Sequence, residues 1–174
     1  PQGKNELEDF VPGAMFSEML LNPGGAYAYQ GHARTFPDAR LVFWAGGNPF
    51  HHHQDLGRLH EAFQTPETII VNEINWTSTA RHADIVLPVA EAPERTDFGA
   101  GKSEDGLVPM PKLVDPPGEA RVEYDIYADL ARRMGTGQEF TEGRTSDAWL
   151  RHIWEQTRRN GKPHGIELPD WDRF

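Results

Sequence analysis

The sequence predicts an α/β fold in which helices flank a parallel sheet, and three observations support it. Apolar runs of strand length occupy residues 40–45, 67–73 and 84–90, which read "RLVFWA", "ETIIVNE" and "DIVLPVA". Segments with helical features separate these runs. The connections are only a few residues long, as in right-handed βαβ units. Together these features predict a Rossmann-like parallel sheet with flanking helices.

The elements before and within this sheet follow from local patterns. "FSEMLLNPGG" predicts a short helix that ends at Asn-Pro-Gly-Gly, and residues 26–39 alternate around Gly31 as in a hairpin or edge strand. The run at 40–45 is continuously apolar, which predicts a strand buried on both faces. A helix is expected over 54–63, and a shorter one within 76–83 with Thr77 or Ser78 as its cap. Pro88 is expected to stop the third strand.

The second half of the chain predicts less regular structure. Residues 91–119 are rich in Pro, Gly and charge, so a long surface loop is expected there. Two helices are expected, over 123–134 and 146–160, followed by an irregular tail. The first helix should bury the face that carries Ile126, Tyr127, Leu130 and Met134. The second should be capped by Ser146 or Asp147, with Gly161 after its end. Its inner face should carry Trp149, Leu150, Ile153 and Trp154. The predicted organisation is a lead-in segment 1–40, an α/β core 41–135 and a C-terminal helix with its tail, 136–174.

Composition excludes several classes of function. Net charge is −10, with 27 acidic and 17 basic residues, which argues against nucleic acid as a partner. No apolar run approaches the roughly 20 residues of a membrane span, so no membrane insertion is expected. The chain has no cysteine and therefore no disulfide, thiolate ligand or iron–sulfur cluster of its own. Its first residues resemble no signal peptide, and we expect an internal fragment of a longer protein.

The predicted strand ends carry the candidate binding residues. In such sheets the ligand lies beyond the carboxyl ends of the strands, where Gly46, Gly47 and Asn48 follow the first strand and Asn72 and Glu73 end the second. Glycines let the backbone approach a phosphate, and an acid in the position of Glu73 is typical of a ribose contact. Glu73 could equally be a solvated strand end. Beyond the third strand, Arg95 could contact a phosphate or a purine edge. "GGNPF" is not the full G-x-G-x-x-G motif, which disfavours a standard NAD site.

The three adjacent histidines, His51 to His53, raise the alternative of a metal site. Helices bring residues i and i+4 together and strands bring i and i+2 together, so three consecutive imidazoles converge on one ion only through an irregular backbone. We therefore favour histidines at a helix start that contact neighbours or a ligand, and predict no metal ligand in this segment.

Four motifs in this order, "LVFWAGGNPFHHHQDLGRL", "PETIIVNE", "TARHADIVLP" and "ERTDFG", together resemble the molybdopterin oxidoreductases of the dimethyl sulfoxide reductase family. The similarity is greatest to the branch of biotin sulfoxide, trimethylamine oxide and dimethyl sulfoxide reductases, and extends from about residue 16 to 174. The resemblance implies one cofactor-binding domain of a larger enzyme that holds molybdenum bis(molybdopterin guanine dinucleotide). Carried over position by position, the family's cofactor contacts fall on Asn48, His52, Asn72, Glu73, Arg95 and Glu123, with Asp125 as the alternative to Glu123.

The resemblance also implies the reaction of the whole enzyme, the reduction of S-oxides or N-oxides by oxygen-atom transfer. An electron donor protein or a small reductant returns the electrons. The family's serine ligand to molybdenum lies upstream of this segment, so no catalytic residue is predicted here and the fragment alone is expected to be inactive. Members of this branch occur in the bacterial periplasm or cytoplasm, which leaves the compartment open. Two alternatives are a stand-alone guanine-nucleotide-binding α/β module and a structural remnant with an empty pocket.

Overall fold

The computed structural model describes residues 10–101 and 106–174, and these form two compact units. One unit extends to Leu87 and the other begins at Pro88. The predicted lead-in 1–40 and loop 91–119 each lie partly outside the described residues. No helix in the described part of the chain is long and apolar enough to cross a membrane.

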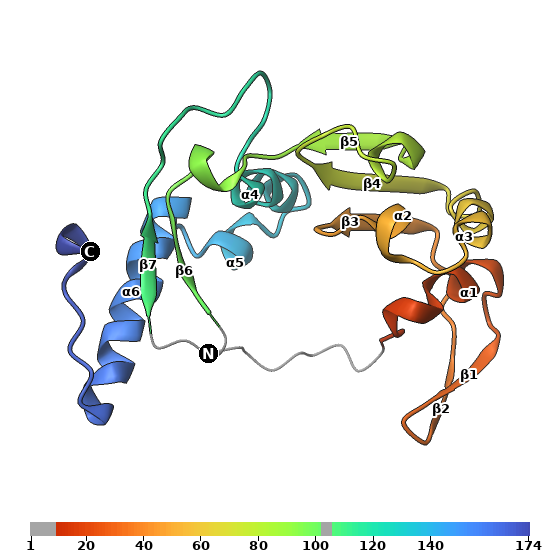
Figure 1. Cartoon of the computed structure of the whole chain (residues 1–174), viewed down its shortest axis with the longest axis horizontal. Helices are drawn as coiled ribbons and strands as arrows, with labels where there is room; N and C mark the ends of the chain where they lie inside the picture. Colours follow the sequence, from red (N-terminus) through yellow and green to blue (C-terminus); the bar gives the residue numbers. More distant parts are fainter. Residues whose placement is uncertain (1–9, 102–105) are drawn as a thin grey trace. The chain divides into compact units, whose positions relative to one another are not determined.

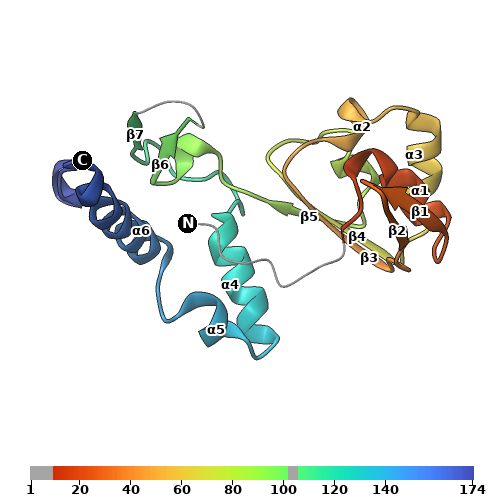
Figure 2. The same cartoon turned by 90° about the horizontal axis from the view of Figure 1, so that it is seen from below.

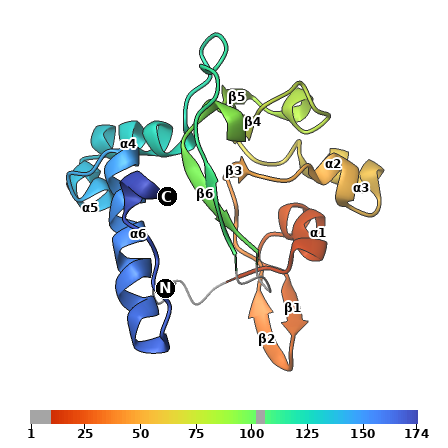
Figure 3. The same ribbon diagram turned by 60° about the vertical axis from the view of Figure 1, so that its left-hand side comes forward.

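The first unit contains the parallel sheet that the sequence predicts, with strand order β3-β4-β5 (Figure 1). Its strands are β3 (Leu41–Ala45), β4 (Thr68–Glu73) and β5 (Ile85–Pro88). The helices and helical turns of this unit are η1 (Gly13–Met15), α1 (Phe16–Leu21), α2 (Pro49–His52), α3 (Leu56–Ala62) and η2 (Ala80–His82). A separate hairpin joins β1 (Ala26–Tyr29) to β2 (His32–Thr35), as expected around Gly31, and is easily followed in Figure 3.

Burial of one sheet face stabilises this unit. Val42 of β3 and Ile69 and Val71 of β4 pack in one cluster with Leu20 of α1 and Leu59 of α3. Strand residues two apart share a face, so this cluster defines the covered side, on which α1 and α3 both lie (Figure 2). Burying a Leu, Ile or Val side chain contributes about 1.5–3 kcal/mol, which makes this cluster the main source of the unit's stability.

The prediction that the first strand is buried on both faces was wrong. Leu41 is 57% exposed, and Phe43 is only half-buried although it lies in the middle of β3. The reason is that the helices of this unit that contribute to the core, α1, α2 and α3, pack on the Val42 side of the sheet.

The second unit contains a hairpin where the sequence predicts an irregular loop. After the turn η3 (Ala92–Glu94), β6 (Asp97–Ala100) pairs antiparallel with β7 (Leu107–Met110). The many Pro and Gly residues of 91–119 led to the wrong prediction for these short strands. In a two-stranded sheet the outer edge of each strand has no neighbouring strand, so no N–H donor is needed there and a proline is tolerated. Pro109 lies in β7.

The helices and helical turns after this hairpin are α4 (Glu123–Arg133), α5 (Gly137–Thr141), α6 (Ser146–Gly161), η4 (Lys162–His164) and η5 (Trp171–Arg173). The expected inner face of α4 is partly wrong. Ile126 is buried, but Met134 is 78% exposed and Leu130 is exposed, because α5 packs against α4 where Ala128 and Ala131 are buried. Small side chains allow this close approach.

The caps of α6 also differ from the prediction. Thr145 is the N-cap, its Oγ1 accepting from the Ala148 N–H at 3.3 Å, and Gly161 is the last helical residue because η4 continues the turn. On the predicted inner face Trp154 is fully buried, whereas Ile153 is 44% exposed.

Candidate functional site

Parallel pairing brings the first two predicted strand ends to one edge of the sheet. Ala45, the last residue of β3, pairs with Asn72 in β4, so the Gly46-Gly47-Asn48 turn and Glu73 leave the sheet at the same edge. Asn72 is buried at 5% exposure, whereas Asn48 and Glu73 are half-buried. The carboxyl edge thus gathers three of the six residues implied by the family resemblance.

The glycine turn leaves its backbone open. Gly46 and Gly47 have φ angles of 78° and 72°, both in the left-handed region, and no other heavy atom lies within 4 Å of the position that a Cβ would take at either residue. The two glycines are therefore required by conformation and not by crowding. This open backbone fits a phosphate group, because side chains would keep a ligand away from it.

Asn48 is the N-cap of α2, and its side chain is held by a neighbouring turn. Its Oδ1 accepts a hydrogen bond from the hydroxyl of Thr79, a residue with no exposed surface. This bond fixes the side-chain amide, and its Nδ2 makes no hydrogen bond to any residue that the structure describes. Asn48 can therefore donate to an anionic ligand.

Glu73 is held by the turn that follows it. One carboxylate oxygen accepts from the Ile74 N–H at 2.9 Å, and the other accepts from the Thr77 hydroxyl at 2.8 Å. The Thr77 Oγ1 in turn accepts from the Ala80 N–H at 3.2 Å. The N-cap of η2 is nevertheless Thr79, so the prediction of Thr77 or Ser78 as the cap was wrong. Each carboxylate oxygen keeps acceptor capacity, so the carboxylate can also accept from ribose hydroxyls.

The three histidines do not form one cluster. His51 and His52 are exposed on the short helix α2, while His53 is half-buried, with its ring 6.1 Å from that of Phe16. Among the described residues, no group of three or more His, Asp or Glu side chains is placed to hold a metal ion. His52 offers a free imidazole, with no hydrogen bond or ring contact to other described residues.

The second unit holds the other two predicted contacts. Arg95 donates to Asp97 at 2.5 Å and lines a cavity of about 580 Å³ within this unit, together with Asp125. Glu123 begins α4 and is half-buried, but it does not line this cavity.

Three cations line this cavity, and each forms an ion pair with a carboxylate outside it. Arg95 pairs with Asp97, Lys112 with Asp115 at 2.6 Å, and Arg121 with Asp129 at 2.8 Å. The hydrogen bonds from Lys112 and Arg121 lower the pKa values of the Asp115 and Asp129 carboxyls. Such partly exposed pairs contribute little to stability. The carboxylates of Glu94, Asp125 and Asp147 also line the cavity, so its lining carries charges of both signs.

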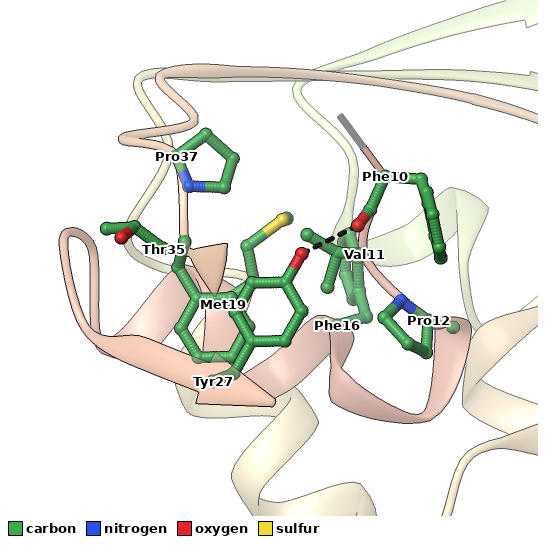
Figure 4. Close-up of a pocket in the computed structure, with 10 residues that line it drawn as sticks. Phe10, Val11, Pro12, Phe16, Met19, Tyr27, Thr35 and Pro37 are labelled. Carbon is green, nitrogen blue, oxygen red and sulfur yellow. Dashed lines mark hydrogen bonds between the residues drawn. The ribbon is translucent and has the colours of Figure 1, made fainter. Parts of the chain in front are cut away.

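A second pocket, of about 430 Å³, lies in the first unit and contains none of the predicted contacts. It is mainly apolar and is lined by Phe16, Met19 and Phe36 among others, with the Tyr27 hydroxyl donating to the Phe10 carbonyl at 2.6 Å (Figure 4). The predicted chemistry therefore does not belong to this pocket.

Sequence reasoning missed the residues that hold the site. Thr77 and Thr79 position Glu73 and Asn48, and Lys112 and Arg121 line the cavity of the second unit. The two threonines lie in the segment that follows the second strand, and hydroxyls close to a strand end are a usable signal. The two cations lie far from Arg95 along the chain, and no local pattern indicates them.

Comparison with known proteins identifies the family. The family model of the molybdopterin oxidoreductases matches residues 15–133. The chain belongs to the molybdopterin oxidoreductase family. Membership implies a molybdenum–molybdopterin cofactor.

Similar full-length proteins are much longer. The chain is 47% identical over 169 residues to biotin sulfoxide reductase of Cereibacter sphaeroides, covering 97% of this chain and 23% of that protein. It is 43% identical over 166 residues to dimethyl sulfoxide/trimethylamine N-oxide reductase of Rhodobacter capsulatus, covering 94% and 20% respectively. The chain thus spans about a fifth of the length of these molybdopterin oxidoreductases.

A solved structure supports the fold. Acetylene hydratase from Pelobacter acetylenicus superposes with a TM-score of 0.54 at 24% identity, over 60% of this chain and 14% of that one. This likeness concerns the fold alone.

The hydrogen bond between Thr79 and Asn48 predicts an asymmetric effect of mutation. Asn48→Ala leaves the fully buried Thr79 hydroxyl without its acceptor, which we expect to cost about 1–3 kcal/mol of unfolding free energy. Thr79→Val removes that hydroxyl, and the half-buried Asn48 amide can reach water, so a smaller cost is expected. Urea unfolding of both variants and the double variant measures this. A greater loss in Thr79→Val than in Asn48→Ala would contradict it.

Proposed function

We propose that this chain binds the nucleotide end of a molybdopterin guanine dinucleotide within a molybdenum oxidoreductase that reduces S-oxides or N-oxides. The observation that carries the proposal is the carboxyl edge of the sheet, where an open left-handed Gly46-Gly47 turn adjoins Asn48, Asn72 and Glu73. The names of the similar reductases support the reaction class, and the remainder of the same polypeptide supplies the rest of that enzyme.

Each residue has a role that its chemistry allows. Asn48 and His52 donate to phosphate oxygens beside the glycine turn, and Asn72 and Glu73 contact the ribose. A carboxylate beside the base can accept two hydrogen bonds from guanine, because guanine has an N–H and an NH₂ group on one edge. When bound, the molybdenum group supplies the oxygen-atom transfer, with electrons from a donor protein or small reductant. The residues of this chain bind and orient the cofactor.

In the second unit, Arg95 contacts a phosphate or the purine, and one of two carboxylates assists. The resemblance favours Glu123, with Asp125 as the alternative. Asp125 lines the same cavity as Arg95, whereas Glu123 does not, and this favours Asp125 as the ligand contact. Cofactor retention in Glu123→Gln and Asp125→Asn distinguishes them, because only the contacting carboxylate contributes a hydrogen bond to the ligand.

Arg95→Ala and Glu73→Ala in the full-length protein test the proposal. Both remove contacts to the nucleotide end, and losing a hydrogen bond to a charged group weakens binding by about 1.5–3 kcal/mol. We expect less molybdenum and less guanine nucleotide per purified protein in both variants, measured after denaturing release.

The matched controls are Arg40→Ala and Glu67→Ala. These two residues form an exposed ion pair just before β3 and β4, so they lie at the opposite end of the same strands. We expect normal loading in both controls. Normal loading in Arg95→Ala and Glu73→Ala as well would refute the site, and a wild-type protein that released no guanine nucleotide would refute the guanine form of the cofactor.

A further inference from the structure

Trp76 is an unusually placed tryptophan. Its side chain is 71% exposed, and its indole makes no hydrogen bond or ring contact to any residue that the structure describes. The other four tryptophans of the chain, Trp44, Trp149, Trp154 and Trp171, all make ring contacts. Trp76 therefore plays no part in packing within the first unit.

The turn that carries Trp76 is held by hydrogen bonds on both sides of it. The Glu73 carboxylate binds the Ile74 N–H and the Thr77 hydroxyl, and the Thr77 N–H donates to the Asn75 carbonyl at 2.8 Å. After the tryptophan, the Arg81 N–H donates to the Thr77 carbonyl at 3.1 Å. The backbone that presents the indole is thus ordered before any ligand binds, which lowers the entropic cost of a contact there.

The location of this turn indicates its ligand. It follows β4 directly at the carboxyl edge, where Glu73 is the proposed ribose contact. The base of a nucleotide is bonded to its ribose, so it lies within a few ångströms of the carboxylate that holds the ribose hydroxyls. Trp76 is three residues beyond Glu73, and its indole offers an exposed aromatic face.

We propose that the indole of Trp76 stacks on the base of the bound nucleotide, and so is a cofactor-binding residue in addition to those already named. This inference rests on the proposed function. Stacking of a base on an aromatic side chain tolerates any base, because every base has a π-face. Trp76 thus contributes affinity for the nucleotide end, while the polar contacts contribute its orientation.

The test compares three variants of the full-length protein. Trp76→Ala removes the aromatic face, Trp76→Phe keeps one, and Ile74→Ala removes a neighbouring exposed apolar side chain while keeping the N–H that Glu73 binds. The probe is the guanine nucleotide of the cofactor. Samples are taken at intervals during dialysis and denatured, and the nucleotide that was still bound to the protein is measured. From the usual free energy of stacking between a base and an aromatic side chain, we expect Trp76→Ala to lose nucleotide roughly 5- to 150-fold faster than wild type. Trp76→Phe and Ile74→Ala should remain within about threefold of wild type.

Two outcomes would overturn the inference. If Trp76→Ala retains nucleotide like wild type while Arg95→Ala and Glu73→Ala lose it, the proposed function stands and the stacking does not. If Trp76→Phe and Ile74→Ala lose nucleotide as fast as Trp76→Ala, the turn is an apolar surface covered by protein and not a stacking platform. A wild-type protein that releases no guanine nucleotide refutes the proposed function itself and this inference with it.

Discussion

Trp154→Ala is expected to destabilise the second unit by about 3–5 kcal/mol, the usual cost of truncating a fully buried tryptophan. Trp154 has no exposed surface and lies in α6. Its ring stacks on Phe174 with 3.8 Å between centroids and meets Phe98 edge-on at 5.5 Å. Its Nε1–H donates to the Pro169 carbonyl at 3.0 Å. One side chain thus joins α6, β6 and the C-terminal tail.

Denaturant unfolding measures this effect, and hydrogen exchange locates it. We expect faster exchange after residue 88 in Trp154→Ala, since the aromatic cluster belongs to that unit. Trp154→Phe keeps an aromatic ring but loses the hydrogen bond to Pro169, and should cost only about 1–2 kcal/mol. Trp76→Ala is the control for removing an exposed tryptophan, with an expected change within about 0.5 kcal/mol. Equal losses in Trp154→Ala and Trp154→Phe would contradict the central role of the indole packing.

The sheet was predictable from the sequence because its signal is local. β-Branched residues in "TIIVNE" and the apolar run "LVFWA" gave β4 and β3 nearly to the residue, and parallel pairing then required their ends to share an edge. The candidate residues Asn48, Asn72 and Glu73 followed from that topology alone.

Features set by tertiary contacts were not predictable in this way. The burial of α4 depends on α5, which the sequence did not indicate, so Met134 was placed inside although it is exposed. The hairpin of β6 and β7 depends on pairing between two short strands, and their Pro and Gly content argued against it. The hydrogen bond from Thr79 to Asn48 joins residues 31 positions apart, and no short-range sequence pattern predicts such a contact.

In the glycine turn, Gly46→Ala and Gly47→Ala together should cost about 2–4 kcal/mol of unfolding free energy. Both residues have left-handed φ angles, and that conformation costs an L-residue roughly 1–2 kcal/mol. The added methyl groups meet no other atom within 4 Å, so the cost is conformational and not steric. Gly13→Ala is the control, because that position is equally open but has no positive φ, and it should be nearly neutral.

The same double variant separates strain from ligand binding in the full-length protein. Leu59→Ala should destabilise the first unit by a similar amount, about 2–5 kcal/mol, through a cavity in the core at a distance along the chain from the turn. If the open backbone contacts phosphate, the glycine variant loses guanine nucleotide much faster than Leu59→Ala at matched stability, because its methyl groups hold the phosphate away from the N–H groups. Equal rates of nucleotide loss in the two variants would reduce the glycines to a conformational role and remove the turn from the binding site.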